Sequence, residues 1–287
     1  MNFEVLFDEG EPSALSDPAF AAYGKLGFPA PPADRPWTFA NFVQSIDGLA
    51  SFGGKHATGG DLAQSEEDRW LMDLLRAHAD AILLGLNTLV SETAVLPHVN
   101  QGRGPVYRIQ HAELRTLRQR LRRSRETVIV VTASANFDPS AYRLFDSDVV
   151  NPLVLTTAAG GSRLAGTKAQ VIMAGKDHSV DLPLAVQMLR RDLGIEYLLC
   201  EGGPTLYGNM ARAGLIDEKF VTVAPREIGL IAPPEQGPSA TESKNPPRLR
   251  PTTFTAPGFT WENAPRWRWM SCRRSGNLQF SRYRRQR

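Results

Sequence analysis

The 287-residue chain has little cysteine, no long apolar run and no strong excess of one charge. Its two cysteines, Cys200 and Cys272, form no ligand-spaced pair, so we expect no structural metal site. This cysteine usage suits the cytosol. No run of 18 apolar residues is present, so we expect no transmembrane span. The first residues, MNFEVLFDEGEPS, lack a basic segment followed by an apolar core, so we expect no signal peptide and a cytoplasmic location.

The composition is that of an ordinary globular protein, with 42% hydrophobic and 22% charged residues. The length suits one large α/β domain with tails, or two small domains. Residues 1–36 are rich in proline, alanine and acidic side chains, which predicts an N-terminal arm with little regular structure. We take residues 37–287 as the main domain.

A stretch near the middle of the chain predicts a strand, a glycine turn and a helix in direct succession. Ile195–Cys200 is a short apolar run typical of a buried strand. Glu201, Gly202 and Gly203 follow at once, and Leu206, Met210 and Ala213 then give the apolar spacing of a helix that stops at Gly214. Two glycines therefore lie where a strand ends and a helix begins.

That placement favours a phosphate site, because the first turn of a helix carries unpaired N–H groups and glycines let a phosphate approach the backbone. Pro204 fits the first helical position and Thr205 adds a hydroxyl donor. The alternative is a tight turn without a ligand. Glu201 favours a ligand, because a carboxylate at the carboxyl end of a strand points into the crevice where α/β sheets bind ligands.

A second glycine junction strengthens this hypothesis. Asp80–Gly85 reads as another buried strand, and Gly85–Thr88 turns into a short helix. Two such junctions in one sheet favour a dinucleotide site, although neither is the GxGxxG fingerprint.

The other predicted elements alternate along the chain, which indicates an α/β fold with a largely parallel sheet. The Ser275–Asn277 turn predicts a C-terminal hairpin, and the proline-rich residues 229–259 predict a long loop. The further predicted strands are Trp37–Ser45, Glu126–Thr132, Pro152–Thr157, Gln170–Ala174 and Phe220–Ala224, and the further helices are Asp61–His78, Glu113–Arg125 and Asp181–Leu193.

Arginine is concentrated in two places. The helix Glu113–Arg125 could be a nucleic-acid patch, but we favour a solvated helix face because no aromatic residues are interleaved. We also expect the closing Arg282, Arg284, Arg285 and Arg287 to be solvated. The glycine-rich loop Phe52–Gly60, which holds Lys55 and His56, is either a surface loop or a segment that closes over substrate.

Three ordered motifs carry a resemblance to a known family. They are N-F-V-x-S-x-D-G at Asn41–Gly48, L-R-A-x-A-D-A-I-L-L-G-x-x-T at Leu75–Thr88, and E-G-G-P-T-L…A-G-L-I-D-E…A-P at Glu201–Pro225. Together they resemble the reductase domain of the bacterial bifunctional riboflavin-biosynthesis deaminase-reductase. The R-P-W that ends the arm and the closing G-N-L-x-F-x-R-Y-R-R look like a stand-alone, actinobacterial-type branch. The resemblance covers roughly residues 36 to 285, and no deaminase motif H-x-E with P-C-x-x-C is present.

The resemblance implies a dihydrofolate-reductase-like fold, a mixed and mostly parallel sheet flanked by helices, usually in a homodimer. It implies an NADPH-dependent reductase like 5-amino-6-(5-phosphoribosylamino)uracil reductase, which converts a ribosylamino-pyrimidine to the ribitylamino form, or one that acts on a related pteridine-like substrate. The catalytic residues would be Ser45 and Asp47 beside the nicotinamide, with Glu201 in the crevice. Glu92 and Thr58 would contact substrate. The cofactor residues would be Gly85, Asn87 and Thr88, Gly202, Gly203, Thr205 and Leu206 at the diphosphate, and Thr132 and Ser134 near the adenosine ribose.

The chain departs from the family pattern at two substrate positions. Leu49 stands where the family commonly has a lysine, and Val99 where it has an arginine, although Arg103 is close in sequence. Glu92 takes the place of the family's acid.

The predicted mechanism is hydride transfer from the nicotinamide to an imine or open-chain sugar over Ser45 and Asp47. Asp47 could instead cap its own turn, and Glu201 could hold the glycine turn through backbone N–H groups. A second class of function is a non-catalytic dinucleotide- or RNA-binding protein that uses the arginine-rich helix Glu113–Arg125.

Overall fold

The computed structural model describes residues 1–13, 15–53, 58–121, 123, 125–176, 178–231 and 249–286. Its strands are β1 (Glu4–Asp8), β2 (Trp37–Ser45), β3 (Ala81–Gly85), β4 (Thr127–Val131), β5 (Asn151–Thr156), β6 (Gln170–Met173), β7 (Tyr197–Gly202), β8 (Glu218–Ala224), β9 (Trp267–Ser275) and β10 (Leu278–Arg285). Its α-helices are α1 (Pro18–Tyr23), α2 (Gly59–Ala63), α3 (Glu66–His78), α4 (Leu86–Val95), α5 (Ala112–Arg120), α6 (Ala158–Arg163), α7 (Leu182–Leu193) and α8 (Pro204–Arg212). Short 3₁₀ helices are η1 (Val99–Gly102), η2 (Pro139–Ala141) and η3 (Arg143–Asp146).

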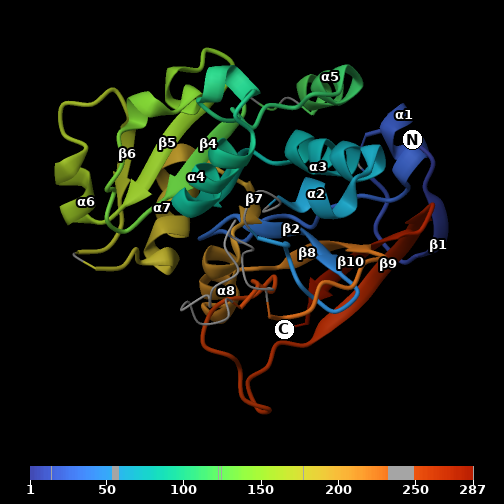
Figure 1. The fold of residues 1–287 in the computed structure, drawn as a ribbon. Helices are drawn as coiled ribbons and strands as arrows, with labels where there is room; N and C mark the ends of the chain where they lie inside the picture. Colours follow the sequence, from blue (N-terminus) through green and yellow to red (C-terminus); the bar gives the residue numbers. More distant parts are fainter. Residues whose placement is uncertain are drawn as a thin grey trace, which may run out of the picture.

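All ten of these strands form one sheet, in the order β1-β9-β10-β8-β2-β7-β3-β4-β5-β6 (Figure 1). The strands from β8 to β6 run parallel to one another. The hairpin of β9 and β10 joins antiparallel to β8, and β1 joins antiparallel to β9. The predicted mixed, mostly parallel sheet with a C-terminal hairpin is therefore confirmed.

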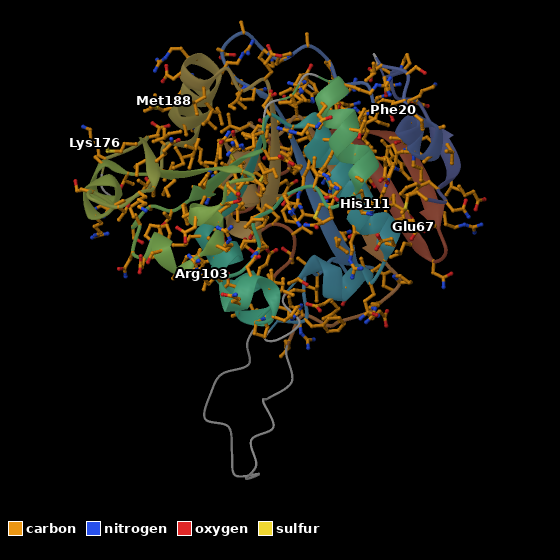
Figure 2. The ribbon with its side chains drawn as sticks, turned by 90° about the horizontal axis from the view of Figure 1, so that it is seen from above. Phe20, Glu67, Arg103, His111, Lys176 and Met188 are labelled. Atoms are coloured by element: carbon orange, nitrogen blue, oxygen red, sulfur yellow. The ribbon has the colours of Figure 1, made fainter. Side chains whose placement is uncertain are left out.

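The sheet separates two apolar cores, and alternation along the strands decides which core each side chain enters. On β2, Phe39 and Val43 join the core under α2, α3, α4 and α5, whereas Ala40 joins the core under α7 and α8. Figure 1 shows α2, α3 and α4 on the near face of the sheet. Figure 2 shows Phe20 and His111 on one side of the molecule and Lys176 and Met188 on the other.

The arm is more ordered than its composition predicts. β1 pairs with β9, and α1 begins at Pro18 after Asp17, whose side chain accepts the N–H of Ala19. Tyr23 and Leu26 are each only 1% exposed in the core. The expectation of little regular structure was wrong because the C-terminal hairpin supplies a strand edge that is distant in sequence.

The predicted helix Asp61–His78 is two helices. Gln64 adopts a left-handed conformation with φ 48°, which ends α2. Ser65 then begins α3, since its side chain accepts the N–H of Asp68. The sequence signal for this break was Gln64 and Ser65, two polar residues in the middle of the predicted helix.

The two arginine-rich segments are solvated only in part: Arg115 and Arg120 of α5 are exposed as expected, and Arg287 lies outside the described residues. On α5, the buried Arg118 donates to the carbonyls of Arg76 and Ala79 at 2.8 and 2.6 Å. At the C-terminus, Arg282 is fully buried and donates to Glu218 at 2.7 Å, and Arg284 donates to the same carboxylate at 2.6 Å. These guanidinium groups join elements of the fold, so Arg118 is not available for contact with a nucleic acid.

Candidate functional site

A cavity of about 1840 Å³ opens at the carboxyl ends of the central parallel strands. Residues at or just beyond the ends of β3, β4 and β7 line it, together with residues of β2, α2, α3, α4 and α8. This is the edge of an open α/β sheet where ligands bind, because the helices that follow the strands begin there.

The two glycine corners meet inside this cavity, as the sequence predicts. A Cβ atom placed on Gly85 would lie 3.8 Å from the backbone nitrogen of Gly203. A Cβ atom on Gly203 would lie only 3.0 Å from Oγ1 of Thr88. The peptide bond between Gly202 and Gly203 is cis. Side chains at either corner would fill the space that a ligand close to both backbones requires.

Both helices that begin at these corners lack a side-chain cap. α4 starts after Gly85 and α8 after Gly203, and neither has a side-chain hydrogen bond at its first turn. By contrast, Ser65 caps α3 and Asp181 caps α7. The first turns of α4 and α8, including Asn87, Thr88, Thr205 and Leu206, line the cavity. Two uncapped helix starts in one cavity fit a diphosphate, which accepts N–H bonds and favours the positive end of a helix dipole.

Thr132 and Ser134 lie at the cavity wall beyond β4. The Thr132 hydroxyl accepts the N–H of Ala135 at 3.1 Å, and the Ser134 hydroxyl accepts the N–H of Asn136. The exposed Arg163 of α6 donates to the carbonyl of Ser134 at 2.6 Å. A cation therefore lies next to the segment that the resemblance places at the adenosine ribose.

Glu201 lines the cavity as an ion pair rather than as an isolated carboxylate. Its two oxygens accept from Nε and Nη2 of Arg76, both at 2.7 Å. Such a bidentate pair fixes the carboxylate in one orientation. The alternative role, holding the glycine turn through its backbone N–H groups, is not seen among the hydrogen bonds of the described residues.

Glu92 lies beside this pair. Its Oε2 accepts from the hydroxyl of Tyr107 at 2.6 Å, and the Arg76 guanidinium lies 5.8 Å from the centre of the Tyr107 ring. Burial raises the pKa of Glu92, the Tyr107 hydroxyl lowers it, and the nearby Glu201 raises it. Glu92, Tyr107, Arg76 and Glu201 all line the cavity. The sequence predicted the two carboxylates here, but it gave no role to Arg76 or Tyr107.

Ser45 and Asp47 lie together but do not line the cavity. The buried Ser45 hydroxyl donates to the Asp47 carboxylate, which lowers the pKa of Asp47. Asp47 also accepts the backbone N–H groups of Ile228 and Gly229, the latter at 2.7 Å. Asp47 therefore ties the end of β2 to the segment after β8, in addition to bonding within its own turn.

Thr58 lines the cavity as the first residue before α2, where its hydroxyl accepts the N–H of Asp61 at 3.2 Å. Lys55 and His56, discussed above for loop closure, lie outside the described residues. Leu49, at the family's lysine position, is buried and donates its N–H to Ser45. Val99 lines the cavity, but Arg103 pairs with Asp146 and lies outside the lining.

The described residues were compared with the requirements of a metal cluster and of a membrane-spanning helix. No group of three or more His, Cys, Asp or Glu side chains there could hold a metal ion. Within the same ranges, no helix is both long enough and apolar enough to cross a bilayer.

Known proteins resemble this chain in sequence and in fold. The family model for the RibD C-terminal domain matches residues 36–258. The 2,5-diamino-6-ribosylamino-4(3H)-pyrimidinone 5′-phosphate reductase of Methanothermobacter thermautotrophicus is 30% identical over 197 residues, which are 68% of this chain and 80% of that protein. The reductase of the same name from Archaeoglobus fulgidus is 27% identical over 68% of this chain and 83% of its own length.

Solved structures share the fold. A pyrimidine reductase-like protein from Corynebacterium diphtheriae has a TM-score of 0.64 and 24% identity, over 95% of this chain and 100% of that one. The riboflavin biosynthesis reductase of Saccharomyces cerevisiae has a TM-score of 0.55 and 16% identity, over 92% and 94% of the two chains. With the family model matching most of its length, this chain belongs to the RibD C-terminal domain family and is an oxidoreductase of the pyrimidine reductase type.

Proposed function

We propose that the protein uses NADPH to reduce a ribosylamino-pyrimidine 5′-phosphate to its ribitylamino form. The observation that carries this proposal is the meeting of Gly85 and Gly203, each before an uncapped helix, inside one cavity. The archaeal relatives are named for reduction of 2,5-diamino-6-ribosylamino-4(3H)-pyrimidinone 5′-phosphate, and we take this compound as the first substrate to test.

The chain's own residues would bind and orient the reactants. The N–H groups at the starts of α4 and α8 would hold the diphosphate, and Gly203 leaves room for it. When bound, the nicotinamide supplies a hydride to an electrophilic carbon of the substrate. The Arg76–Glu201 pair would fix one wall of the substrate space, with Glu92 and Thr58 nearby. Ser45 and Asp47 would act from behind this wall by holding the end of β2, rather than by touching the reacting atoms.

The preference for NADPH over NADH rests on Arg163. Its guanidinium donates to the Ser134 carbonyl, beside the cavity wall where the adenosine ribose would lie. A 2′-phosphate on that ribose would find a cation with further N–H donors.

We further propose a cytoplasmic homodimer. Cys200 and Cys272 are unpaired and buried, which suits a reducing compartment. Large apolar side chains are exposed near the proline-rich segment, among them Trp261, Leu249 and Ile231 at 94%, 70% and 59%. Such exposure favours an interface between two copies. Sedimentation of the full chain should give twice the 31.6 kDa mass, and a monomer at every concentration would contradict this.

Turnover tests the function directly. The full chain is mixed with NADPH and 2,5-diamino-6-ribosylamino-4(3H)-pyrimidinone 5′-phosphate, and NADPH consumption and product mass are followed. We expect consumption that requires both reactants and yields a product heavier by two hydrogens. A protein that binds NADPH but reduces neither this compound nor the corresponding uracil would contradict the proposal. Retention of RNA that falls steeply with salt would instead favour the binding-protein alternative.

A further inference from the structure

Tyr107 reaches the cavity wall from a segment without regular secondary structure, between η1 and α5. The residue is only 5% exposed, and its backbone φ of 59° lies in the left-handed region that residues other than glycine rarely adopt. The segment is fixed on α3 a few residues later, where Asp73 accepts the backbone N–H groups of Gln110 and His111 at 2.7 and 3.1 Å. Uncommon backbone conformations that the surrounding structure holds in place cluster at functional sites, which makes Tyr107 a candidate for a role in the cavity.

The contact that Tyr107 makes in the cavity is with Glu92. Its hydroxyl donates to Oε2 of Glu92 at 2.6 Å, and no other described residue donates a hydrogen bond to that carboxyl. The nearby guanidinium of Arg76 serves two other carboxylates, since it donates twice to Glu201 and lies 3.6 Å from Asp73. Glu92 therefore relies on a neutral hydroxyl, whereas Glu201 has a full counter-charge.

The groups that face Glu92 decide which of the two side chains can give up a proton. They are Tyr107, Arg76 of α3 and Glu201 of β7. Burial raises the pKa of Glu92, Tyr107 and Arg76 lower it, Glu201 raises it, and the balance is upward. Glu92 is therefore protonated near neutral pH more often than an exposed glutamate. Tyr107 is a poor acid, because burial and the adjacent Glu92 raise the pKa of its hydroxyl.

One proton and one hydride convert a ribosylamine into a ribitylamine. The bond between C1′ and O4′ of the closed sugar ring breaks, and its electron pair goes to O4′, which takes the proton. The lone pair of the amine nitrogen meanwhile forms a C=N double bond to C1′. C1′ then accepts the hydride, and the electrons of that double bond return to nitrogen. A side chain that gives a proton to O4′ acts as a general acid in the ring-opening step.

Resting on the function proposed above, we propose that Tyr107 is a positioning residue, which holds the Glu92 carboxyl in the orientation from which Glu92 gives the proton to O4′. After the transfer, the Tyr107 hydroxyl donates to a charged carboxylate, and such hydrogen bonds are about twice as strong as neutral ones. Tyr107 therefore stabilises Glu92 most in the state that follows the transfer. Solvent returns the proton to Glu92 once the product has left.

The test measures kcat and KM for 2,5-diamino-6-ribosylamino-4(3H)-pyrimidinone 5′-phosphate as a function of pH. The proteins are the wild type, Tyr107→Phe, Glu92→Gln and the variant that carries both changes. The control is Tyr197→Phe, which removes a hydroxyl that donates to the carbonyl of Pro29 at 3.1 Å, outside the cavity lining. Dissociation constants for NADPH and thermal unfolding are measured on all five proteins.

Tyr107→Phe should lower kcat by about 10-fold with little change in KM, which is the effect of losing one hydrogen bond to a charged group. The alkaline limb of the kcat/KM profile should also move. Loss of the hydroxyl raises the pKa of Glu92, and an acid must be protonated to act, so activity should persist to a pH about 1 unit higher. Tyr197→Phe should match the wild type in rate and in pH profile.

Glu92→Gln should lower kcat by about 100-fold or more, because the general acid is gone. Adding Tyr107→Phe to Glu92→Gln should cost nothing further, since the hydroxyl acts through the carboxyl. NADPH affinity should be the same in all five proteins.

Two results would overturn the inference while leaving the proposed function intact. One is a Tyr107→Phe variant with the kcat and the pH profile of the wild type. The other is a further loss when Tyr107→Phe is added to Glu92→Gln, which would show that Tyr107 supports the cavity wall rather than Glu92. Loss of NADPH binding or of the folded state by Tyr107→Phe would show the same. A wild type that reduces no ribosylamino-pyrimidine would reject the proposed function and this inference together.

Discussion

Buried polar groups are treated differently in the antiparallel part of the sheet and at the cavity. Near β10, Arg282 and Arg284 share the carboxylate of Glu218, and Arg273 of β9 pairs with Asp8 at 2.6 Å. At the cavity, the buried Asp68 forms no ion pair among the described residues, and burial raises the pKa of its carboxyl to about 6. The carboxylate that joins these elements of the fold is matched by guanidinium groups, whereas the Asp68 carboxyl at the cavity is not.

The first turns of the helices also differ, in whether a side chain caps them. Ser65 and Asp181 cap α3 and α7 with side-chain hydrogen bonds, but α4 and α8 begin at glycines without one. A side-chain cap stabilises a helix by about 1 kcal/mol. The uncapped starts of α4 and α8 lie against each other in the cavity, where a bound phosphate would satisfy the free N–H groups of both.

The largest expected effect is on stability, at Glu218. Glu218→Gln leaves the buried Arg282 without its counter-charge, and we expect the free energy of unfolding to fall by about 3–5 kcal/mol. The matched control is Glu4→Gln, whose ion pair with Arg274 is more than half exposed and should be worth less than about 1 kcal/mol. Urea denaturation measures both. Equal losses in the two variants would show that burial of the pair is unimportant.

The next effect is on cofactor binding, at Gly203. Gly203→Asp places a Cβ 3.0 Å from Thr88 Oγ1 and a negative charge where the diphosphate would lie. We expect NADPH affinity to fall by at least about 100-fold, roughly 2.7 kcal/mol. Gly258→Asp is the control, because a Cβ there meets nothing within 4 Å. Titrations that follow nicotinamide fluorescence measure the affinities. If both variants bind NADPH like the wild type, Gly203 does not lie at the diphosphate.

A third effect distinguishes the cavity carboxylate from the paired ones. Because the pKa of Asp68 is raised from 3.8 to about 6 in the folded protein, ionising it disfavours folding. Stability should therefore fall as pH rises from about 4 to about 6 and stay low above that. Asp68→Asn should remove this loss and stabilise the protein by up to about 3 kcal/mol at pH 8, with no gain below pH 4. A variant less stable than the wild type at pH 8 would show that the Asp68 carboxylate supports the fold.

The smallest effect concerns the adenosine end. Arg163→Ala removes the cation beside Ser134, so NADPH should bind about 10-fold more weakly while NADH affinity stays the same. NADH is thus the internal control of the titration. If both cofactors lose affinity equally, Arg163 holds the Ser134 segment instead of reading a 2′-phosphate.

The sequence predicted the parallel sheet and the two glycine corners because both depend on local patterns. Strand-like runs that end in Gly85 or in Gly202 and Gly203 are visible in the chain, and helix spacing follows each of them. That the two corners meet in space follows from the parallel order, since β3 and β7 are neighbours in the sheet.

Other features depend on partners far apart in sequence, and no local pattern reveals them. Arg282 stands in an arginine-rich segment with no local sign of burial, yet it is fully buried and paired with Glu218. Asp68 resembles the other acidic residues of the first turn of α3, and only the cavity distinguishes it. Arg76 was the easiest of these residues to predict. It is a cation beside the apolar leucines of α3, within the family motif Leu75–Thr88.

The central claim is that two helix starts, far apart in the chain, bind one diphosphate. NMR of the labelled full chain, recorded as NADPH is added, tests it through backbone amides. We predict saturable shifts of the Asn87 and Thr88 amides on α4 and of the Thr205 and Leu206 amides on α8, all with one dissociation constant. Amides at the capped start of α1, which lies outside the cavity lining, should move much less. Saturation by NADPH with no shift at α4 or at α8 would contradict the account.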